Sequence, residues 1–172
     1  LADDQGLGKT PQAVVCSNIW TPQHMVVVCP AVVRSTWEAK LHSWDTLQRT
    51  TLLISSGKQS VSADVNVLII SYDLAATAKW RDFLVSYLRA DTASLLVCDE
   101  AHALKNWRSN RTQACLRHLV PAASKLMLLT GTPMTKCISD LHPLVCAIKP
   151  HHFGKLADFC YRYSYPVPTP FG

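Results

Sequence analysis

The sequence predicts an α/β fold in which a mainly parallel sheet carries helices on both faces. Short, apolar, β-branched runs alternate along the chain with longer amphipathic stretches, an order typical of strand–helix–strand units. Several of these runs are apolar on successive residues, which suits strands that are buried on both faces. The chain has 172 residues, of which 48% are hydrophobic, so it can build one domain with its own core.

Five segments are expected to form the strands of this sheet. Each is short, apolar and bounded by polar residues, glycine or proline, which favours a buried strand over a helix. In chain order they are MVVVC (25–29), TLLI (51–54), VNVLIIS (65–71), LLVC (95–98) and KLMLLT (125–130).

Three apolar stripes at helical spacing predict helices between and after these strands. The stripes comprise Val33, Trp37, Leu41 and Trp44; Trp80, Phe83, Leu84, Tyr87 and Leu88; and Leu141, Leu144, Val145 and Ile148. We interpret their aromatic residues as core rather than as ligand contacts. The proline-rich end, YPVPTPFG (165–172), is expected to leave the domain as irregular chain.

Composition sets limits on the partners. The formal net charge of +5 is a mild basic excess and only weakly favours an anionic partner. The seven cysteines form no CxxC pair, and we interpret them as buried thiols in a reducing compartment. The longest apolar run, MVVVCPAVV, is far shorter than the ~20 residues of a membrane-spanning helix, so no membrane partner is expected.

The opening stretch, LADDQGLGKT, contains part of a phosphate-binding loop. The strict pattern G-x-x-x-x-G-K-[ST] has Asp3 at its first position, whereas Gly8, Lys9 and Thr10 match. Gly6 and Gly8 would let backbone N–H groups turn toward phosphate oxygens. Lys9 would reach the β- and γ-phosphates, and Thr10 would offer a hydroxyl to Mg²⁺. A helix that begins near Thr10 would direct its positive end at the phosphates.

A second motif, LLVCDEAH (95–102), places two acids at the carboxyl end of an expected strand, where open α/β sheets bind ligands. Asp99 would hold Mg²⁺ directly or through water, and Glu100 would orient the attacking water. His102 would sense the γ-phosphate or link to a neighbouring motif. An acidic, solvated turn is the alternative for this motif alone, but the phosphate-loop pattern upstream favours ATP binding.

Five segments in order resemble the motifs of the Swi/Snf-type ATPases of helicase superfamily two. The motif I of that family has an aspartate where the strict phosphate loop has its first glycine, as Asp3 does here. Pro30 and Trp37 match motif Ia, and Ser71 and Tyr72 match the motif that follows. The segments are LADDQGLGKTPQA (1–13), VVVCPAVVRSTWEAKLHSW (26–44), VLIISYDL (67–74), CDEAHALKN (98–106) and LLTGTPM (128–134).

Two further features narrow the resemblance. The letters DEAH also occur in the DEAH-type RNA helicases, which typically have GSGKT in motif I and SAT in motif III. This chain has GLGKT and TGTP at those places, which disfavours an RNA helicase. The segment from TGTP through KPHHFGKLADFCYRY to PFG is similar to the annealing-helicase, HARP-like branch. That branch rewinds DNA and remodels stalled replication forks. One departure from it is Met134-Thr135-Lys136, where the branch commonly has alanine and a nearby arginine–proline pair.

The resemblance implies a RecA-like lobe of the P-loop NTPase class that binds ATP and Mg²⁺. Residues 1–150 would form lobe one, and residues 151–172 would begin the segment that leads to lobe two of the same parent chain. Lobe two would supply an arginine finger. Only Leu1 and Ala2 precede the phosphate loop, so the entering strand is expected to be mostly missing. The chain alone is therefore expected to hydrolyse ATP negligibly.

The family also implies a DNA partner, duplex or forked, bound without regard to sequence, and a nuclear location. Contacts to the DNA backbone would depend strongly on salt. Thr130, Gly131 and Thr132 would couple the ATP state to the grip on DNA; the alternative for them is a tight turn after a strand. For Arg34 the alternative is a solvated charge at a helix end. The residues expected at DNA are Arg34, Ser35, Ser71 and Thr130.

Three functions are compatible with these motifs. The leading one is an ATP-dependent DNA translocase that rewinds or remodels forks. A chromatin-remodelling ATPase is the second. The third is a non-catalytic, nucleotide-dependent scaffold on DNA, which the retention of Lys9, Asp99 and Glu100 disfavours because a scaffold has no need to retain all three.

Overall fold

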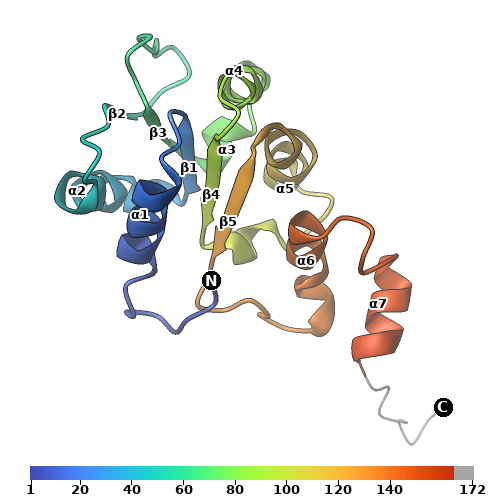
Figure 1. Ribbon diagram of the computed structural model, residues 1–172. Coiled ribbons are helices and arrows are strands. Elements are labelled where there is room, and N and C mark those ends of the chain that lie inside the picture. Colours follow the sequence, from blue (N-terminus) through green and yellow to red (C-terminus); the bar gives the residue numbers. More distant parts are fainter. Residues whose placement is uncertain (165–172) are drawn as a thin grey trace, which may run out of the picture.

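The computed structural model describes residues 1–164, so the expected irregular exit at 165–172 lies outside the described residues. Five parallel strands form one sheet with the order β2-β3-β1-β4-β5 (Figure 1). Each expected segment forms a strand, with small shifts at the ends. The strands are β1 (Met25–Cys29), β2 (Thr51–Leu53), β3 (Val67–Ser71), β4 (Leu95–Asp99) and β5 (Lys125–Leu129).

Helices cover both faces of the sheet, which confirms the expected α/β architecture. Figure 1 shows α1 and α2 on one face, and α4, α5 and α6 on the other. A π-helical turn, Gln113–Leu119, continues α5, and short 3₁₀ segments join several elements. The helices are α1 (Lys9–Trp20), α2 (Arg34–Trp44), α3 (Tyr72–Ala75), α4 (Ala78–Arg89), α5 (Asn110–Thr112), α6 (His142–Ile148) and α7 (Leu156–Tyr163).

Each strand contributes side chains to two separate cores, because successive residues of a strand point to opposite faces. In β1, Val26 and Val28 pack with α4 and the π-helical turn, whereas Met25, Val27 and Cys29 pack with α1 and α2. This two-sided burial explains why the strands are apolar on successive residues.

The expected helical stripes are correct at their centres and wrong at some edges. Trp37 and Trp80 are buried, as expected for core residues. Trp44 is 48% exposed and Ile148 is 63% exposed, so neither belongs to the core; each is the last residue of its helix. Phe83 is also partly exposed, at the margin of the α4 stripe.

The expectation of buried cysteines is correct for three of the seven. All seven are free thiols, and Cys29, Cys98 and Cys115 are buried in the two cores, whereas Cys137 is exposed and the other three are partly exposed. Among the described residues, none of the helices has the length and apolar character needed to cross a membrane.

The first residue lies against the edge of the sheet beside β5. The Leu1 ammonium donates to the carbonyl of Leu128 at 2.8 Å, and the Leu1 carbonyl accepts from the N–H of Thr130 at 3.1 Å. The chain that enters the phosphate loop is therefore held next to β5 at the sheet edge, where Figure 1 marks the N-terminus.

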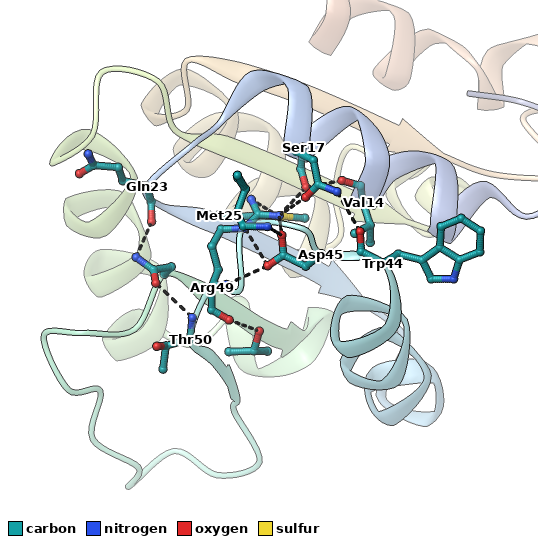
Figure 2. Close-up of polar contacts among 12 residues, drawn as sticks. Val14, Ser17, Gln23, Met25, Trp44, Asp45, Arg49 and Thr50 are labelled. Atoms are coloured by element: carbon teal, nitrogen blue, oxygen red, sulfur yellow. Dashed lines mark hydrogen bonds and ion pairs between the residues drawn. The ribbon is translucent and has the colours of Figure 1, made fainter.

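A buried ion pair between Arg49 and Asp45 fastens α1 to the loop between α2 and β2 (Figure 2). Both side chains are only 5% exposed. The guanidinium donates to Asp45 at 3.0 and 3.1 Å, to Ser17 Oγ at 2.7 Å and to Asn18 Oδ1 at 3.4 Å. The backbone N–H groups of Leu47 and Arg49 also donate to the Asp45 carboxylate, so both charges are well satisfied.

The ion pair sets the protonation state of Asp45. Burial raises the pKa of this carboxyl, but the hydrogen bonds and the charge of Arg49 outweigh burial, so the pKa lies below the ordinary 3.8. Because the folded-state pKa is depressed, the stabilisation is present above pH 3.8 and is lost as the pH falls below that value.

We expect Arg49→Met to lower the free energy of unfolding by about 3–5 kcal/mol, because the buried Asp45 carboxylate loses its counter-ion. Urea unfolding at neutral pH measures the loss, and the deficit should shrink in acid as Asp45 protonates. Arg81→Met is the matched control: its pair with Asp82 is far more exposed and should contribute about 1 kcal/mol or less. Equal losses in the two variants would contradict the assignment of Arg49 as a structural ion-pair partner.

Candidate functional site

The sequence motifs converge at the edge of the sheet where its parallel strands end. The loops that follow β4 and β5 reach this edge together with the loop that precedes α1. Ligands of open α/β sheets bind at this edge, outside the carboxyl ends of the strands.

The phosphate loop has the backbone that its glycines permit. Gly6 and Gly8 have φ angles of +84° and +76°, a region that other residues rarely adopt. A Cβ added at either position would meet nothing within 4 Å, so the loop faces open space. Gly8 caps α1, whose first N–H groups therefore point toward this space.

Lys9 and Asp3 hold the loop together. The Lys9 ammonium donates to the carbonyls of Asp3 and Asp4, each at 2.9 Å. The Gln12 amide donates to the Asp3 carboxylate at 3.3 Å and to the Leu7 carbonyl at 3.0 Å. The Asp3 side chain therefore links the loop to α1 through Gln12, and the Lys9 ammonium bonds back to the start of the loop.

Asp99 lies at the end of β4, and three elements hold it. Its side chain accepts a hydrogen bond from the Trp37 indole N–H of α2 at 2.8 Å through Oδ2. Oδ1 accepts from the backbone N–H of Glu100 at 2.9 Å, and the Asp99 carbonyl accepts from the Tyr72 hydroxyl at 2.7 Å. The residue is 9% exposed, so these contacts fix its position in a largely dry environment.

Glu100 begins the turn after β4 with an unusual backbone. Its φ of +50° is in the left-handed region, which is uncommon for a residue with a side chain. Within the described residues, Glu100 Oε2 is buried without a hydrogen-bond partner, although His102 Nδ1 lies 3.2 Å from it. A buried carboxylate oxygen with unused acceptor capacity is suited to bind a water or a ligand donor.

His102 lies between the acidic motif and the TGTP loop. Its Nδ1 is 3.2 Å from Thr130 Oγ1 and 3.3 Å from Thr132 Oγ1, as well as 3.2 Å from Glu100. The Thr132 N–H donates to Thr130 Oγ1 at 3.1 Å. One imidazole thus contacts both motifs.

Gly131 brings the TGTP loop against the phosphate loop. A Cβ at this position would lie 2.9 Å from Gln5 Cγ, 3.4 Å from the Gln5 backbone nitrogen and 3.5 Å from Lys9 Nζ. No larger residue fits without displacing the Gln5 side chain, and an added methyl group would also touch Lys9 Nζ. The three motifs therefore meet at a single place.

A cavity of about 480 Å³ opens between these motifs and α2. Six of its residues are not among those that the sequence predicts for the site: Gln5, Pro11, Val33, Thr36, Trp37 and Lys40. Helical spacing predicts Val33 and Trp37 as core residues rather than as site residues. The cavity is lined by Gln5, Gly6, Gly8, Lys9, Thr10, Pro11, Val33, Thr36, Trp37, Lys40, Asp99 and Glu100.

The residues of the cavity fit a nucleotide with Mg²⁺. Backbone N–H groups and the ammonium groups of Lys9 and Lys40 complement phosphate. The Thr10 hydroxyl and the Asp99 carboxylate are the oxygen ligands that Mg²⁺ prefers. Burial, followed by the nearby Asp99 charge, raises the pKa of the Cys29 thiol to about 12, so this cysteine at the end of β1 stays protonated and is not a nucleophile.

The residues expected at DNA do not line the cavity, and three of the four already bond within the chain: Arg34, Ser71 and, as described above, Thr130. Arg34 donates to the carbonyls of Ala31 at 3.1 Å and Ile54 at 2.5 Å. Ser71 is buried and caps α3 by accepting from the Leu74 N–H at 3.3 Å. Ser35 is in the first turn of α2. Their contact with DNA stays a prediction.

Comparison with known proteins adds an independent finding. The sequence model of one protein family, the SNF2-related domain, matches residues 1–169. A Xenopus laevis protein, SWI/SNF-related matrix-associated actin-dependent regulator of chromatin subfamily A-like protein 1, is 33% identical over the whole chain. Protein CHROMATIN REMODELING 25 of Arabidopsis thaliana is 31% identical over 97% of the chain. The chain spans 17% and 20% of the lengths of these two relatives.

Solved structures show the same fold. The Sulfolobus solfataricus SWI2/SNF2 ATPase core in complex with dsDNA superposes with a TM-score of 0.76 and 22% identity, covering 96% of this chain and 34% of that one. The Sulfolobus solfataricus SWI2/SNF2 ATPase core domain superposes with a TM-score of 0.72 and 23% identity, covering 96% of this chain and 33% of that one. The expected RecA-like fold is confirmed.

We expect Gly131→Ala to weaken the binding of ATP in Mg²⁺ by roughly tenfold, because the added methyl group must displace the Gln5 side chain within the phosphate loop. Titration with a fluorescent ATP analogue measures the change. Gly57→Ala is the matched control, since a Cβ there meets nothing within 4 Å. Unchanged affinity in Gly131→Ala would show that the TGTP loop does not control the phosphate loop.

Proposed function

The chain belongs to the SNF2-related family, and from this premise we propose that it is lobe one of an ATP-dependent motor that moves on DNA. The observation that carries the proposal is the convergence of Lys9, Asp99 and Glu100 on one cavity, with the TGTP loop in contact with the same site. ATP and Mg²⁺ are the ligands that these residues suit.

Each residue of the cavity would have a separate role in the hydrolysis of ATP. Lys9 would exchange its bonds to the Asp3 and Asp4 carbonyls for phosphate oxygens, which changes the packing of the loop when nucleotide binds. Thr10 and Asp99 would hold Mg²⁺, which when bound neutralises charge on the phosphate oxygens. Glu100 would accept a hydrogen bond from a water and orient it for attack on the terminal phosphate.

His102 would report the state of the nucleotide to the DNA side of the lobe. It lies within 3.3 Å of the Thr130 and Thr132 hydroxyls and within 3.2 Å of Glu100. A movement of Glu100 upon water or phosphate binding would change these contacts. Thr130 and Thr132 would then alter the loop that we propose to contact DNA.

We place DNA along the loops that follow β1, β3 and β5, with duplex or forked DNA as the partner. Binding would use backbone phosphates and so would be independent of sequence and sensitive to salt. Residues 1–150 would act as lobe one and residues 151–172 as the start of the segment toward lobe two of the parent chain. Lobe two would add an arginine finger, and the motor would work in the nucleus.

Annealing-helicase activity at forks is the specific output that we favour, from the resemblance of the segment after TGTP. A chromatin-remodelling ATPase is the second candidate, and the names of the Xenopus and Arabidopsis relatives favour it. A mouse relative that is 29% identical, DNA repair and recombination protein RAD54B, has a name that favours action on DNA under repair.

We expect Glu100→Gln in the full-length parent to reduce DNA-stimulated ATP hydrolysis by roughly 10²–10⁴-fold while ATP still binds, because the amide cannot accept a proton from water. Glu38 is the only other glutamate of the chain and is exposed on α2. Glu38→Gln is therefore the matched control and should leave hydrolysis unchanged.

The same assay with different nucleic acids separates the candidate functions. Stimulation by forked DNA above duplex DNA supports the annealing helicase, and stimulation by duplex or nucleosomal DNA without a fork preference supports the remodeller. Stimulation by RNA alone would contradict a DNA motor. Hydrolysis absent under every condition would favour the scaffold.

A further inference from the structure

The side chain of Trp37 makes an unusual hydrogen bond for a core residue. It is 1% exposed in the core between α2 and the sheet, yet its indole N–H donates to the carboxylate of Asp99 at 2.8 Å. The two residues are 62 positions apart in the chain. A bond between two buried side chains, one of them a carboxylate, is stronger than a bond between neutral groups.

Trp80 shows what a purely structural tryptophan does in this fold. It is 2% exposed on the opposite face of the sheet, and its indole N–H donates to the backbone carbonyl of Ser56 at 3.2 Å. A buried indole needs one acceptor, and a backbone carbonyl is sufficient. Burial of the Trp37 indole therefore does not in itself require a hydrogen bond to the Asp99 carboxylate.

The bond leaves the Asp99 carboxylate able to bind a cation. An ionised carboxylate has about four lone-pair sites. The Trp37 indole uses one on Oδ2 and the Glu100 N–H uses one on Oδ1, so each oxygen keeps acceptor capacity. The indole is a neutral donor, so it fixes the rotation of the carboxylate without bringing a positive charge that would compete with a metal ion.

Trp37 is itself held in a rigid frame that includes the phosphate loop. It lies on α2, and the Asn18 amide of α1 donates to the Trp44 carbonyl at the end of α2 at 2.8 Å. The buried Arg49–Asp45 pair, in the loop that directly follows α2, also bonds to α1 through Ser17 (Figure 2). Since α1 begins at the phosphate loop, this frame fixes Asp99 relative to Thr10.

We propose that Trp37 is a positioning residue, whose indole N–H holds the Asp99 carboxylate in the orientation that receives the Mg²⁺ of the bound nucleotide. This inference rests on the proposed function. It assigns to Trp37 a role in metal affinity, beyond its part in the core.

The test compares Trp37→Phe with Trp80→Phe in the full-length parent. Both variants lose a buried indole, but only the first removes a donor from Asp99. Binding of a fluorescent ATP analogue is measured across a Mg²⁺ titration and in EDTA, together with thermal unfolding. Trp37→Phe should raise the Mg²⁺ concentration for half-maximal binding by roughly tenfold, as expected for the loss of a hydrogen bond to a charged group. Binding in EDTA should be unchanged, and Trp80→Phe should show no Mg²⁺ shift.

Replacing Trp37 with benzothienylalanine provides a second variant if the phenylalanine leaves a cavity that prevents folding. This analogue keeps the shape of the ring and replaces the N–H with sulfur, so any shift in Mg²⁺ dependence reports the hydrogen bond alone. An unchanged Mg²⁺ dependence in both Trp37 variants, or an equal shift in Trp80→Phe, would overturn the role of Trp37.

The wild-type parent separates this inference from the proposed function. If the wild-type parent binds the Mg²⁺-loaded analogue but shows no DNA-stimulated hydrolysis, the proposed motor function is overturned. The Mg²⁺ shift of Trp37→Phe would still decide the role of Trp37. DNA-stimulated hydrolysis without a Mg²⁺ shift would overturn only the role of Trp37. A wild-type parent that binds no nucleotide would overturn both.

Discussion

The parallel register of the strands is the constraint on which the candidate site depends. Asp99 of β4 pairs with Leu129 of β5, so the residues that follow, Glu100 and Thr130, leave the sheet at the same level. This places the acidic motif beside the TGTP loop and lets His102 contact both. A shift of the register by one residue would move every side chain of a strand to the opposite face of the sheet. The register that buries the core side chains therefore also sets which side of the sheet the functional side chains face.

The two cores support the site from opposite faces. On one face, α2 holds Asp99 through Trp37, and the buried ion pair of Arg49 and Asp45 joins the loop after α2 to the helix of the phosphate loop. On the other face, Tyr72 donates to the Asp99 carbonyl. Packing therefore fixes the acid that we propose as a metal ligand, whereas the Lys9 ammonium rests on loop carbonyls that it can exchange for phosphate.

The fold, and the motifs whose residues meet at the candidate site, could be predicted because their signals are local. Apolar runs mark the buried strands, and the glycines with Lys9 and Thr10 mark the loop before α1. Contacts between distant segments have no such signal: the bond of Trp37 to Asp99 and the clamp of Arg49 on α1 depend on how the helices pack. The ends of the helices were predicted less well for the same reason, since the spacing of apolar residues does not show that Trp44, the last residue of α2, is exposed. The π-helical turn at 113–119 has no pattern that we recognised.

A crystal structure of the full-length parent with a non-hydrolysable ATP analogue and Mn²⁺ in place of Mg²⁺ would test the central claim most directly. The claim is that the phosphate loop and Asp99 form one nucleotide–metal site. We predict an anomalous Mn²⁺ peak in contact with the Thr10 hydroxyl and, directly or through water, with Asp99, and a Lys9 ammonium moved from the Asp3 and Asp4 carbonyls onto phosphate. A nucleotide bound outside this cavity, with Lys9 still on those carbonyls, would contradict the account.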